Sequence, residues 1–477
     1  MNIKHTLTAV TSMIVLLTTS CNTTNNQQAD KTSVKPNIIY ILADDMGYGD
    51  LGCYGQQKIQ TPTIDKLAGE GILFTQHYAG NTVCAPSRCA LLTGKDMGHA
   101  DVRGNVQVKP SGQLPIKDET ITVAEALKKA GYTTGMIGKW GLGNYETSGN
   151  PNKQGFDYFY GYTDQVLAHN YWPEYLLRNG EKEYLKNEVT YLDKNAWHEG
   201  LGSISPVKKE FSNDLFTNDA LQFIERNKTK PFFLYLPYTI PHDNGEAPVG
   251  QRQEVPDFGI YKNNNWQGDS LGYAAQITRL DTYVAQILQK LKDLNLDNNT
   301  ILFFSSDNGP LADMEYCNFF DSNGKLRGGK RDLYEGGIRI PLIVRWPGKI
   351  KPNTTSDHIS AFWDFMPTAC EIADIEIPET NGISFLPTLL DKHQKQHDYI
   401  YHEFYEIDGK QSLRKGNWKA VRNNVYKDPN GQPELYDLSK DISEQQNIAD
   451  QYPDVVKELV RLMKEASTPS EIFTFDK

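Results

Sequence analysis

A cysteine, a proline and an arginine stand at a spacing that suits the binding of a small anion, in the run Cys84-Ala85-Pro86-Ser87-Arg88. Pro86 fits the first turn of a helix, where its missing N–H costs nothing, so we expect Cys84 just outside the helix N-terminus. Free N–H groups and the helix dipole favour negative charge there, and Arg88 can fork onto the same tetrahedral anion. A cysteine before a helix is usually a small hydrophobic residue, so spacing alone is not decisive.

Two pairs of acidic or amide side chains follow apolar runs that predict buried strands. Asp44-Asp45 follows residues 37–43, and Asp307-Asn308 follows residues 301–306. Open α/β sheets bind ligands at the carboxyl ends of their strands, and oxygen ligands suit a hard divalent cation. Either pair alone is better explained as a helix cap or turn. Together they favour a metal site, and no His or Cys cluster has zinc-like spacing.

Three further polar residues follow predicted strands or lie in glycine-rich loops. Lys139 lies in Gly138-Lys139-Trp140-Gly141-Leu142-Gly143, His242 ends the run 238–242, and Lys330 lies in the loop 328–337. Taken singly, a lysine is usually solvated and a histidine structural or merely exposed. The position of Lys139 at a predicted strand end favours a function for that lysine.

The complete run from Cys84 to Gly94 resembles the signature of the type I sulfatases, in which an enzyme oxidises the cysteine to formylglycine (3-oxoalanine). The resemblance extends over residues 37–346 and reappears in the segment 434–447. It implies hydrolysis of sulfate esters with Ca²⁺ as cofactor, and a formylglycine-generating or sulfatase-maturating enzyme as partner. The implied metal ligands are Asp44, Asp45, modified Cys84, Asp307 and Asn308. The implied catalytic residues are Cys84, Arg88, Lys139, His242 and Lys330.

At one position the chain departs from the family pattern, so that no residue is assigned to one of the proton transfers. The family often has a histidine where this chain has Gly141. Both His99 and His169 are candidates to replace it, with a preference for His169. His169 lies in the segment 161–173, which resembles a part of carbohydrate sulfatases where a histidine enters the substrate pocket. We therefore expect His169 and His99 to bind substrate.

The chemistry of sulfate ester cleavage explains why a modified cysteine would be needed. A thiolate that attacked sulfur would leave a stable thiosulfate ester. A hydrated aldehyde has two hydroxyls on one carbon, so one attacks and the other then collapses to the aldehyde and expels sulfate. We expect a sulfated carbohydrate as substrate, such as an algal polysaccharide (ulvan or a galactan) or a host glycan. The alternatives are a phosphatase or phosphodiesterase of the same superfamily, or a catalytically silent lipoprotein that binds sulfated glycans.

The start of the chain predicts export. Residues 1–20 combine Lys4 and His5 with an apolar run too short to span a membrane, which is typical of a signal peptide. Thr18-Thr19-Ser20-Cys21 resembles a lipobox, so Cys21 is a candidate for lipidation, and residues 21–34 form a polar tether. We expect a periplasmic or outer-membrane lipoprotein, with cleavage and secretion as the alternative.

Composition limits the class of protein further. With 49 basic and 60 acidic residues the net charge is −11, which argues against nucleic acid as a partner. Of the six cysteines, four remain if Cys21 and Cys84 are modified. These four permit three disulfide pairings; we expect none.

The order of predicted elements gives the fold class. Helices at 122–130, 214–226 and 271–294 alternate with strands at 37–43, 133–137, 232–238, 300–305 and 338–344. This alternation predicts an α/β fold with a mostly parallel sheet covered on both faces. Short strands at 399–404, 412–414 and 418–422 and a helix at 453–466 predict a small antiparallel subdomain. The resemblance implies the alkaline-phosphatase-like fold, with a catalytic domain at 35–394 and a C-terminal subdomain at 395–477.

Overall fold

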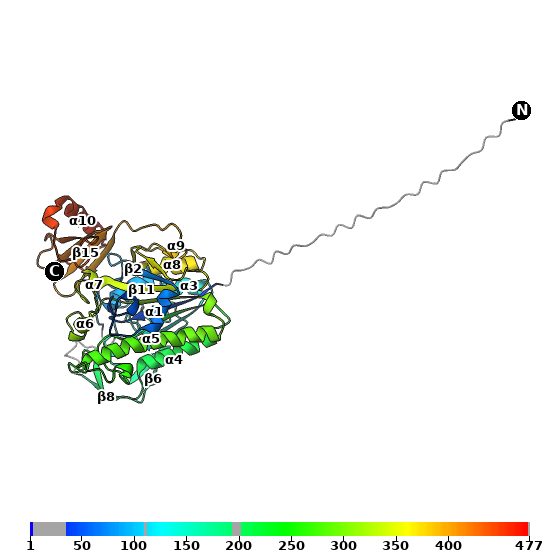
Figure 1. The fold of residues 1–477 in the computed structure, drawn as a ribbon, viewed down its shortest axis with the longest axis horizontal. Coiled ribbons are helices and arrows are strands. Elements are labelled where there is room, and N and C mark those ends of the chain that lie inside the picture. The colour runs from blue at the N-terminus through cyan, green and yellow to red at the C-terminus, as the bar shows by residue number, and fades with distance from the viewer. Residues whose placement is uncertain (3–34, 109–111, 193–201, 476–477) are drawn as a thin grey trace. The chain divides into compact units, whose positions relative to one another are not determined.

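The computed structural model describes residues 1–2, 35–108, 112–192 and 202–475. The chain divides into two units, Met1–Val34 and Lys35–Lys477, and the second is compact (Figure 1). The predicted signal peptide, the tether and Cys21 lie outside the described residues. In the part that is described, no helix is both long enough and apolar enough to cross a membrane.

A central sheet of eleven described strands organises the second unit, and most of its pairings are parallel. Its order is β12 (Thr354–Ser356), β2 (Ile72–Tyr78), β11 (Arg339–Arg345), β10 (Thr300–Ser306), β1 (Asn37–Ala43), β9 (Phe232–Pro237), β3 (Thr133–Lys139), β4 (Tyr158–Tyr162), β5 (Tyr175–Arg178) and β6 (Glu181–Tyr184), with β13 (Ser360–Ala361) also paired to β2. A separate hairpin joins β7 (Glu188–Tyr191) to β8 (Ser203–Val207).

Two hydrophobic cores cover the two faces of this sheet, because alternate residues of each strand point to opposite sides. Ile38, Tyr40 and Leu42 of β1 enter one core, and Ile39 and Ile41 enter the other. The first core contains α2 (Cys84–Thr93), α3 (Val123–Lys129), α8 (Phe365–Ile372) and α9 (Leu386–Leu389). The second contains α1 (Pro62–Gly69), α4 (Ser212–Arg226) and α5 (Asp269–Asp293). Figure 1 shows α4 and α5 together along one side of the sheet, away from α8 and α9.

Local signals set the ends of several elements. Thr122 caps α3 in a reciprocal capping box with Glu125, as its position before an apolar run predicts. Gly94 ends α2 in the left-handed region at φ 67°, where a residue with a side chain is strained. Two short helices, α6 (Glu315–Phe320) and α7 (Glu335–Ile338), flank the loop that carries Lys330.

The C-terminal residues form the predicted small antiparallel sheet. Its four strands are β14 (Ile400–Phe404), β15 (Lys410–Lys415), β16 (Trp418–Asn423) and β17 (Glu434–Asp437). The amphipathic helix α10 (Pro453–Glu465) packs its buried Leu459 and Met463 against Leu413 and Leu435 of this sheet. The sheet begins close to the boundary predicted at residue 395.

The α/β fold class with a mostly parallel sheet is confirmed, but one detail differs from the sequence prediction. β11 runs antiparallel to both β10 and β2, so the sheet is mixed. The sequence pattern does not predict the direction of β11. The connection 307–338 begins and ends at the same edge of the sheet, so β11 starts where β10 ends and runs the opposite way. The five described cysteines, at 53, 84, 89, 317 and 370, are free thiols.

Candidate functional site

The candidate residues converge because four neighbouring parallel strands end at the same edge of the sheet. The strands β10, β1, β9 and β3 are adjacent in that order. Their carboxyl ends lead into Asp307-Asn308, Asp44-Asp45, His242 and Lys139 respectively. A ligand site at the carboxyl ends of parallel strands is therefore a direct consequence of topology.

The chain leaves β1 through a left-handed residue that turns it sharply. Asp45 has φ 62°, a conformation that costs a residue with a side chain about 1–2 kcal/mol. Its backbone N–H donates to Asp307 Oδ1 at 3.1 Å, and its Oδ1 accepts from Asn308 Nδ2 at 2.6 Å. These hydrogen bonds join the two predicted oxygen pairs into one buried cluster.

Cys84 lies on this cluster and is 3% exposed. Its Sγ lies 3.5 Å from Asp44 Oδ1 and 3.6 Å from Lys139 Nζ. The helix α2 begins at Cys84 itself, with Val83 as N-cap, so Cys84 is within the first turn and not just outside it as expected. The difference is within the usual variation of helix ends, and the thiol still lies at the N-terminus of α2.

Arg88 is completely buried beneath Cys84, and its guanidinium joins three parts of the site. Nε and Nη2 both donate to Asp307 Oδ2, at 3.1 and 2.8 Å, and Nη2 also lies 3.2 Å from Asp44 Oδ2. Nη1 donates to the carbonyl oxygen of Lys139 at 2.7 Å. This planar, forked geometry is one that lysine cannot supply.

Lys139 and Lys330 both reach this cluster. Lys139 Nζ donates to Asp44 Oδ2 at 2.7 Å, and Lys330 Nζ donates to Asp45 Oδ2 at 2.7 Å. Lys330 Nζ also lies 3.0 Å from Nε2 of His242, whose Nδ1 lies 2.6 Å from the carbonyl oxygen of Asp243. Because a carbonyl only accepts, Nδ1 carries the proton and Nε2 accepts from the Lys330 ammonium.

Burial and neighbouring charges set the protonation states of these groups. Burial alone raises the pKa of Asp44, but the charges of Lys139 and Arg88 outweigh it and hold that pKa well below its usual range. Burial and the Asp44 carboxylate raise the pKa of Asp307. Burial raises the pKa of the Cys84 thiol to about 12, and burial together with Lys330 lowers the pKa of His242. Cys84 as a thiol and His242 as a neutral imidazole are therefore the forms expected near neutral pH.

The donor set fits a cation. Ligand atoms of Asp44, Asp45, Cys84 and His242 lie within 4.8 Å of one another. Asn308 Oδ1 is buried with no hydrogen-bond donor among the described residues, so it is an acceptor with an unmet requirement. His242 belongs to this geometric group, although the sequence assigned it only to the leaving oxygen.

A cavity of about 620 Å³ opens above the cluster and is lined by Cys84, His242 and Lys330. Its remaining wall includes Gln165 and Arg331, which lie in the segments 161–173 and 328–337 but were given no role from the sequence, and Asn105 and Glu406, which sequence inspection missed. Asn105 Oδ1 accepts from the backbone N–H of Ala85, next to Cys84, and the N–H of Asn105 donates to Glu406 Oε1 at 2.9 Å. No local motif marks Asn105 and Glu406, because they meet only through tertiary packing.

The two substrate-binding candidates lie in different places. His169 lines the cavity, stacks on His242 with ring centroids 4.6 Å apart, and contacts both carboxylate oxygens of Glu246 at 3.1 Å. His99 is not among the lining residues and pairs with Asp96 at 2.6 Å. The structure thus brings only His169 to the cluster.

The space beside Gly141 is filled by another polar side chain. Gly141 has φ 78°, and a Cβ built there would lie 2.9 Å from the Gln165 side chain. Gln165 Nε2 donates to Asn105 Oδ1 at 3.3 Å. A glutamine from the segment 161–173 therefore occupies the region where the family pattern led us to expect a histidine.

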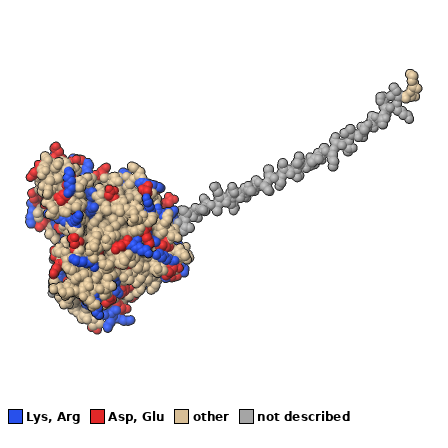
Figure 2. All heavy atoms as spheres, viewed as in Figure 1, with Lys and Arg blue, Asp and Glu red and all other residues tan. Residues whose placement is uncertain are grey.

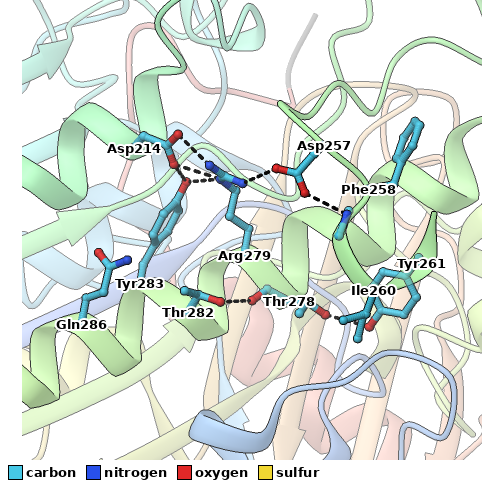
Figure 3. Close-up of a pocket in the computed structure, with 12 residues that line it drawn as sticks. Asp214, Asp257, Phe258, Ile260, Tyr261, Thr278, Arg279, Thr282, Tyr283 and Gln286 are labelled. Carbon is cyan, nitrogen blue, oxygen red and sulfur yellow. Dashed lines mark hydrogen bonds and ion pairs between the residues drawn. The ribbon is translucent and has the colours of Figure 1, made fainter.

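A second cavity, of about 290 Å³, lies along α5 and lacks comparable chemistry (Figure 3). Arg279 lies between Asp214 and Asp257 and pairs with them at 2.7 and 3.4 Å, so its charge is neutralised. On the surface that Figure 2 shows, basic and acidic side chains are interspersed and no broad basic patch is visible. Neither feature competes with the cavity above Cys84.

Comparison with known proteins finds sulfatases along almost the whole chain. The family model described as "Sulfatase" matches residues 36–375, and that described as "N-sulphoglucosamine sulphohydrolase, C-terminal" matches residues 328–468. The N-acetylgalactosamine-6-O-sulfatase of Bacteroides thetaiotaomicron is 33% identical over 95% of this chain and 97% of its own length. Human arylsulfatase A is 32% identical over 90% and 86%.

Solved structures agree with these sequence matches. One from a study of glycosaminoglycan metabolism by Bacteroides thetaiotaomicron has a TM-score of 0.74 and 31% identity, covering 91% of this chain and 99% of that one. The crystal structure of Ps i-CgsB in complex with k-i-k-neocarrahexaose has a TM-score of 0.76 and 26% identity, covering 90% and 92%.

Proposed function

The chain belongs to the sulfatase family and is a sulfuric ester hydrolase, and from this premise we propose that it removes sulfate from a carbohydrate with a formylglycine at position 84 and a bound Ca²⁺. The observation that supports this most strongly is the position of Cys84. Its Sγ lies within 3.6 Å of Asp44 and Lys139, at the floor of a cavity large enough for a sugar.

The state of the thiol favours modification. With its pKa raised to about 12, unmodified Cys84 is almost entirely protonated at neutral pH and is a poor nucleophile. Oxidised to formylglycine and hydrated, the residue supplies an oxygen nucleophile and a second hydroxyl through which sulfate can be released.

The surrounding side chains bind and orient the reacting group. Arg88 and Lys139 place two buried positive charges beside position 84, where they neutralise the sulfuryl oxygens as charge develops. His242 and Lys330 would act together on the leaving oxygen, since Lys330 Nζ lies 3.0 Å from His242 Nε2 and both line the cavity. His242 holds that ammonium in place through its own bond to the Asp243 carbonyl.

The charges of the cluster support a divalent cation. Three carboxylates (Asp44, Asp45 and Asp307) face three cations (Arg88, Lys139 and Lys330), so their formal charges cancel. A bound Ca²⁺ would make the site net positive and stabilise negative charge on the sulfuryl oxygens. Asp44, Asp45, Asp307, Asn308 and modified Cys84 would hold it, since oxygen ligands suit this ion.

Among carbohydrate sulfates, we favour the 6-O-sulfate of N-acetylgalactosamine as the first substrate to test. The relative from Bacteroides thetaiotaomicron that is 33% identical over almost the whole chain is named for that activity. Sulfated algal oligosaccharides form the second group to test, because Ps i-CgsB was crystallised with k-i-k-neocarrahexaose.

The test is sulfate release by protein expressed with a maturation enzyme. Wild type should release sulfate from at least one of these sugars, and Cys84→Ala should release none while keeping its fold by circular dichroism. A matched phosphate ester should be a much poorer substrate. Turnover by Cys84→Ala, or a preference for phosphate, would refute the assignment.

Export and lipidation complete the proposal. If Cys21 carries lipid, the protein should fractionate with membranes, and Cys21→Ser should shift it to the soluble fraction. A soluble wild-type protein would favour cleavage and secretion.

A further inference from the structure

Arg331 is the one arginine in the described part of the chain whose guanidinium has no hydrogen bond or ion pair with another described residue. Every other arginine there has at least one such partner. Arg331 nevertheless lines the cavity together with Cys84. An unpaired guanidinium at a substrate cavity is available to bind a substrate anion.

The backbone holds Arg331 in an uncommon conformation. Its φ is 74°, in the left-handed region that costs a residue with a side chain about 1–2 kcal/mol. Its N–H donates to the Thr82 carbonyl at 3.1 Å, and its carbonyl accepts from Lys410 Nζ at 2.7 Å. The strain is thus maintained by contacts on both sides, immediately after the residue that reaches Asp45.

Arg331 and the catalytic cations lie at different depths. Arg88 and Lys139 are at most 1% exposed and lie beside Cys84, whereas Arg331 is an exposed residue. The scissile sulfate is therefore matched by buried charges at the floor, and Arg331 is left for a different group. The same cavity is lined by the amides of Asn105, Gln107, Gln113 and Gln165, which suit sugar hydroxyls. It is also lined by Glu406, whose pKa is raised by burial while the nearby charge of Arg331 acts in the opposite direction.

We propose that Arg331 determines specificity by binding a second anionic group of the glycan, a carboxylate or another sulfate, while the first sulfate lies at Cys84. This inference depends on the proposed function, because it assumes a sulfated carbohydrate in the cavity. A second anionic group is a feature of the substrate that sulfate ester chemistry alone does not require.

The test compares sugars that differ only in one charge. The first pair is N-acetylgalactosamine 6-sulfate linked to a hexuronate, and the same disaccharide with its carboxylate methyl-esterified. The second pair is N-acetylgalactosamine 4,6-disulfate and the 6-sulfate. Values of kcat/KM are measured with matured protein, and Kd values with Cys84→Ala protein, so that binding is known even if no sulfate is released.

Wild type should favour the charged member of at least one pair, and Arg331→Ala should reduce kcat/KM and affinity for it by about 10- to 100-fold, as for one charged hydrogen-bonded contact. The neutral member should change less than about threefold. Arg331→Lys should retain part of the effect, since it keeps the charge and loses the fork. The affected pair identifies the anion as carboxylate or sulfate.

The matched control is Lys325→Ala, which removes an exposed positive charge from the same connection outside the cavity lining. It should leave all four sugars unaffected. Equal losses for charged and neutral sugars in Arg331→Ala, or no loss, would overturn the inference. Absence of sulfate release by wild type, with charge-dependent binding intact, would instead overturn the proposed function alone.

Discussion

Replacing Arg88 by lysine separates the positive charge at the floor of the site from its geometry. The guanidinium donates twice to Asp307 and once to the Lys139 carbonyl, and it also lies beside Asp44. A lysine ammonium keeps the charge, but its single nitrogen cannot make all of these contacts from one position. The substitution therefore tests whether the fork, and not charge alone, organises the site.

The size of the effect follows from the bonds that are lost. A hydrogen bond to a charged group contributes about 1.5–3 kcal/mol. In Arg88→Lys, one hydrogen bond to Asp307 is lost and the positive charge moves from its original position. Together these changes should cost about 2–4 kcal/mol of transition-state stabilisation, which lowers kcat/KM by about 30- to 1000-fold.

The assay measures sulfate release together with urea unfolding and the mass of the peptide containing Cys84, because Arg88 lies within the run that resembles the maturation signal. Arg103→Lys is the matched control, since Arg103 is buried and bonded to Glu403 outside the cavity lining. Arg88→Lys protein that is fully modified and within about threefold of wild-type activity would refute the reasoning.

Three other predictions follow from the structure. His77 and His402 are buried with pKa values lowered to about 3 and about 4, so the unfolded chain binds more protons below pH 6.5. The contribution of these histidines to the free energy of unfolding should be complete above that pH and fall by about 2 kcal/mol per histidine at pH 5, as measured by urea unfolding. If His402→Gln had the same pH dependence as wild type, the prediction would be contradicted. Chelation should abolish activity and lower the melting temperature, with Ca²⁺ restoring both; Asn308→Ala should need about tenfold more Ca²⁺, and an unchanged requirement would contradict its role. In unmatured protein, alkylation of Cys84 should accelerate about tenfold per pH unit from pH 7 to 10 without a plateau, since its pKa is about 12; a plateau near pH 9 would show an ordinary thiol.

The parts of the site that the sequence predicts are those attached to buried strands. Asp44 and Asp307 follow continuous apolar runs, and in a parallel sheet such runs end at a common edge. Pro86 predicts the helix that presents Cys84. In each case a local pattern determines both the element and the end at which the polar residue lies.

Other parts depend on long-range packing that no local pattern reports. Gln165 fills the space beside Gly141, and Glu406 reaches the cavity from the loop that follows β14. The antiparallel direction of β11 is also hidden, because the periodicity of a buried strand is the same in either direction. These features depend on which segments become neighbours in the folded chain.

The central claim is that an aldehyde at position 84 performs the reaction, and the mass of one tryptic peptide tests it most directly. Residues 67–88 form a peptide in which Cys84 is the only cysteine. In protein that releases sulfate from a sulfated sugar, this peptide should carry formylglycine, and the fraction converted should be proportional to activity. Full activity with an unmodified thiol at position 84 would contradict the account.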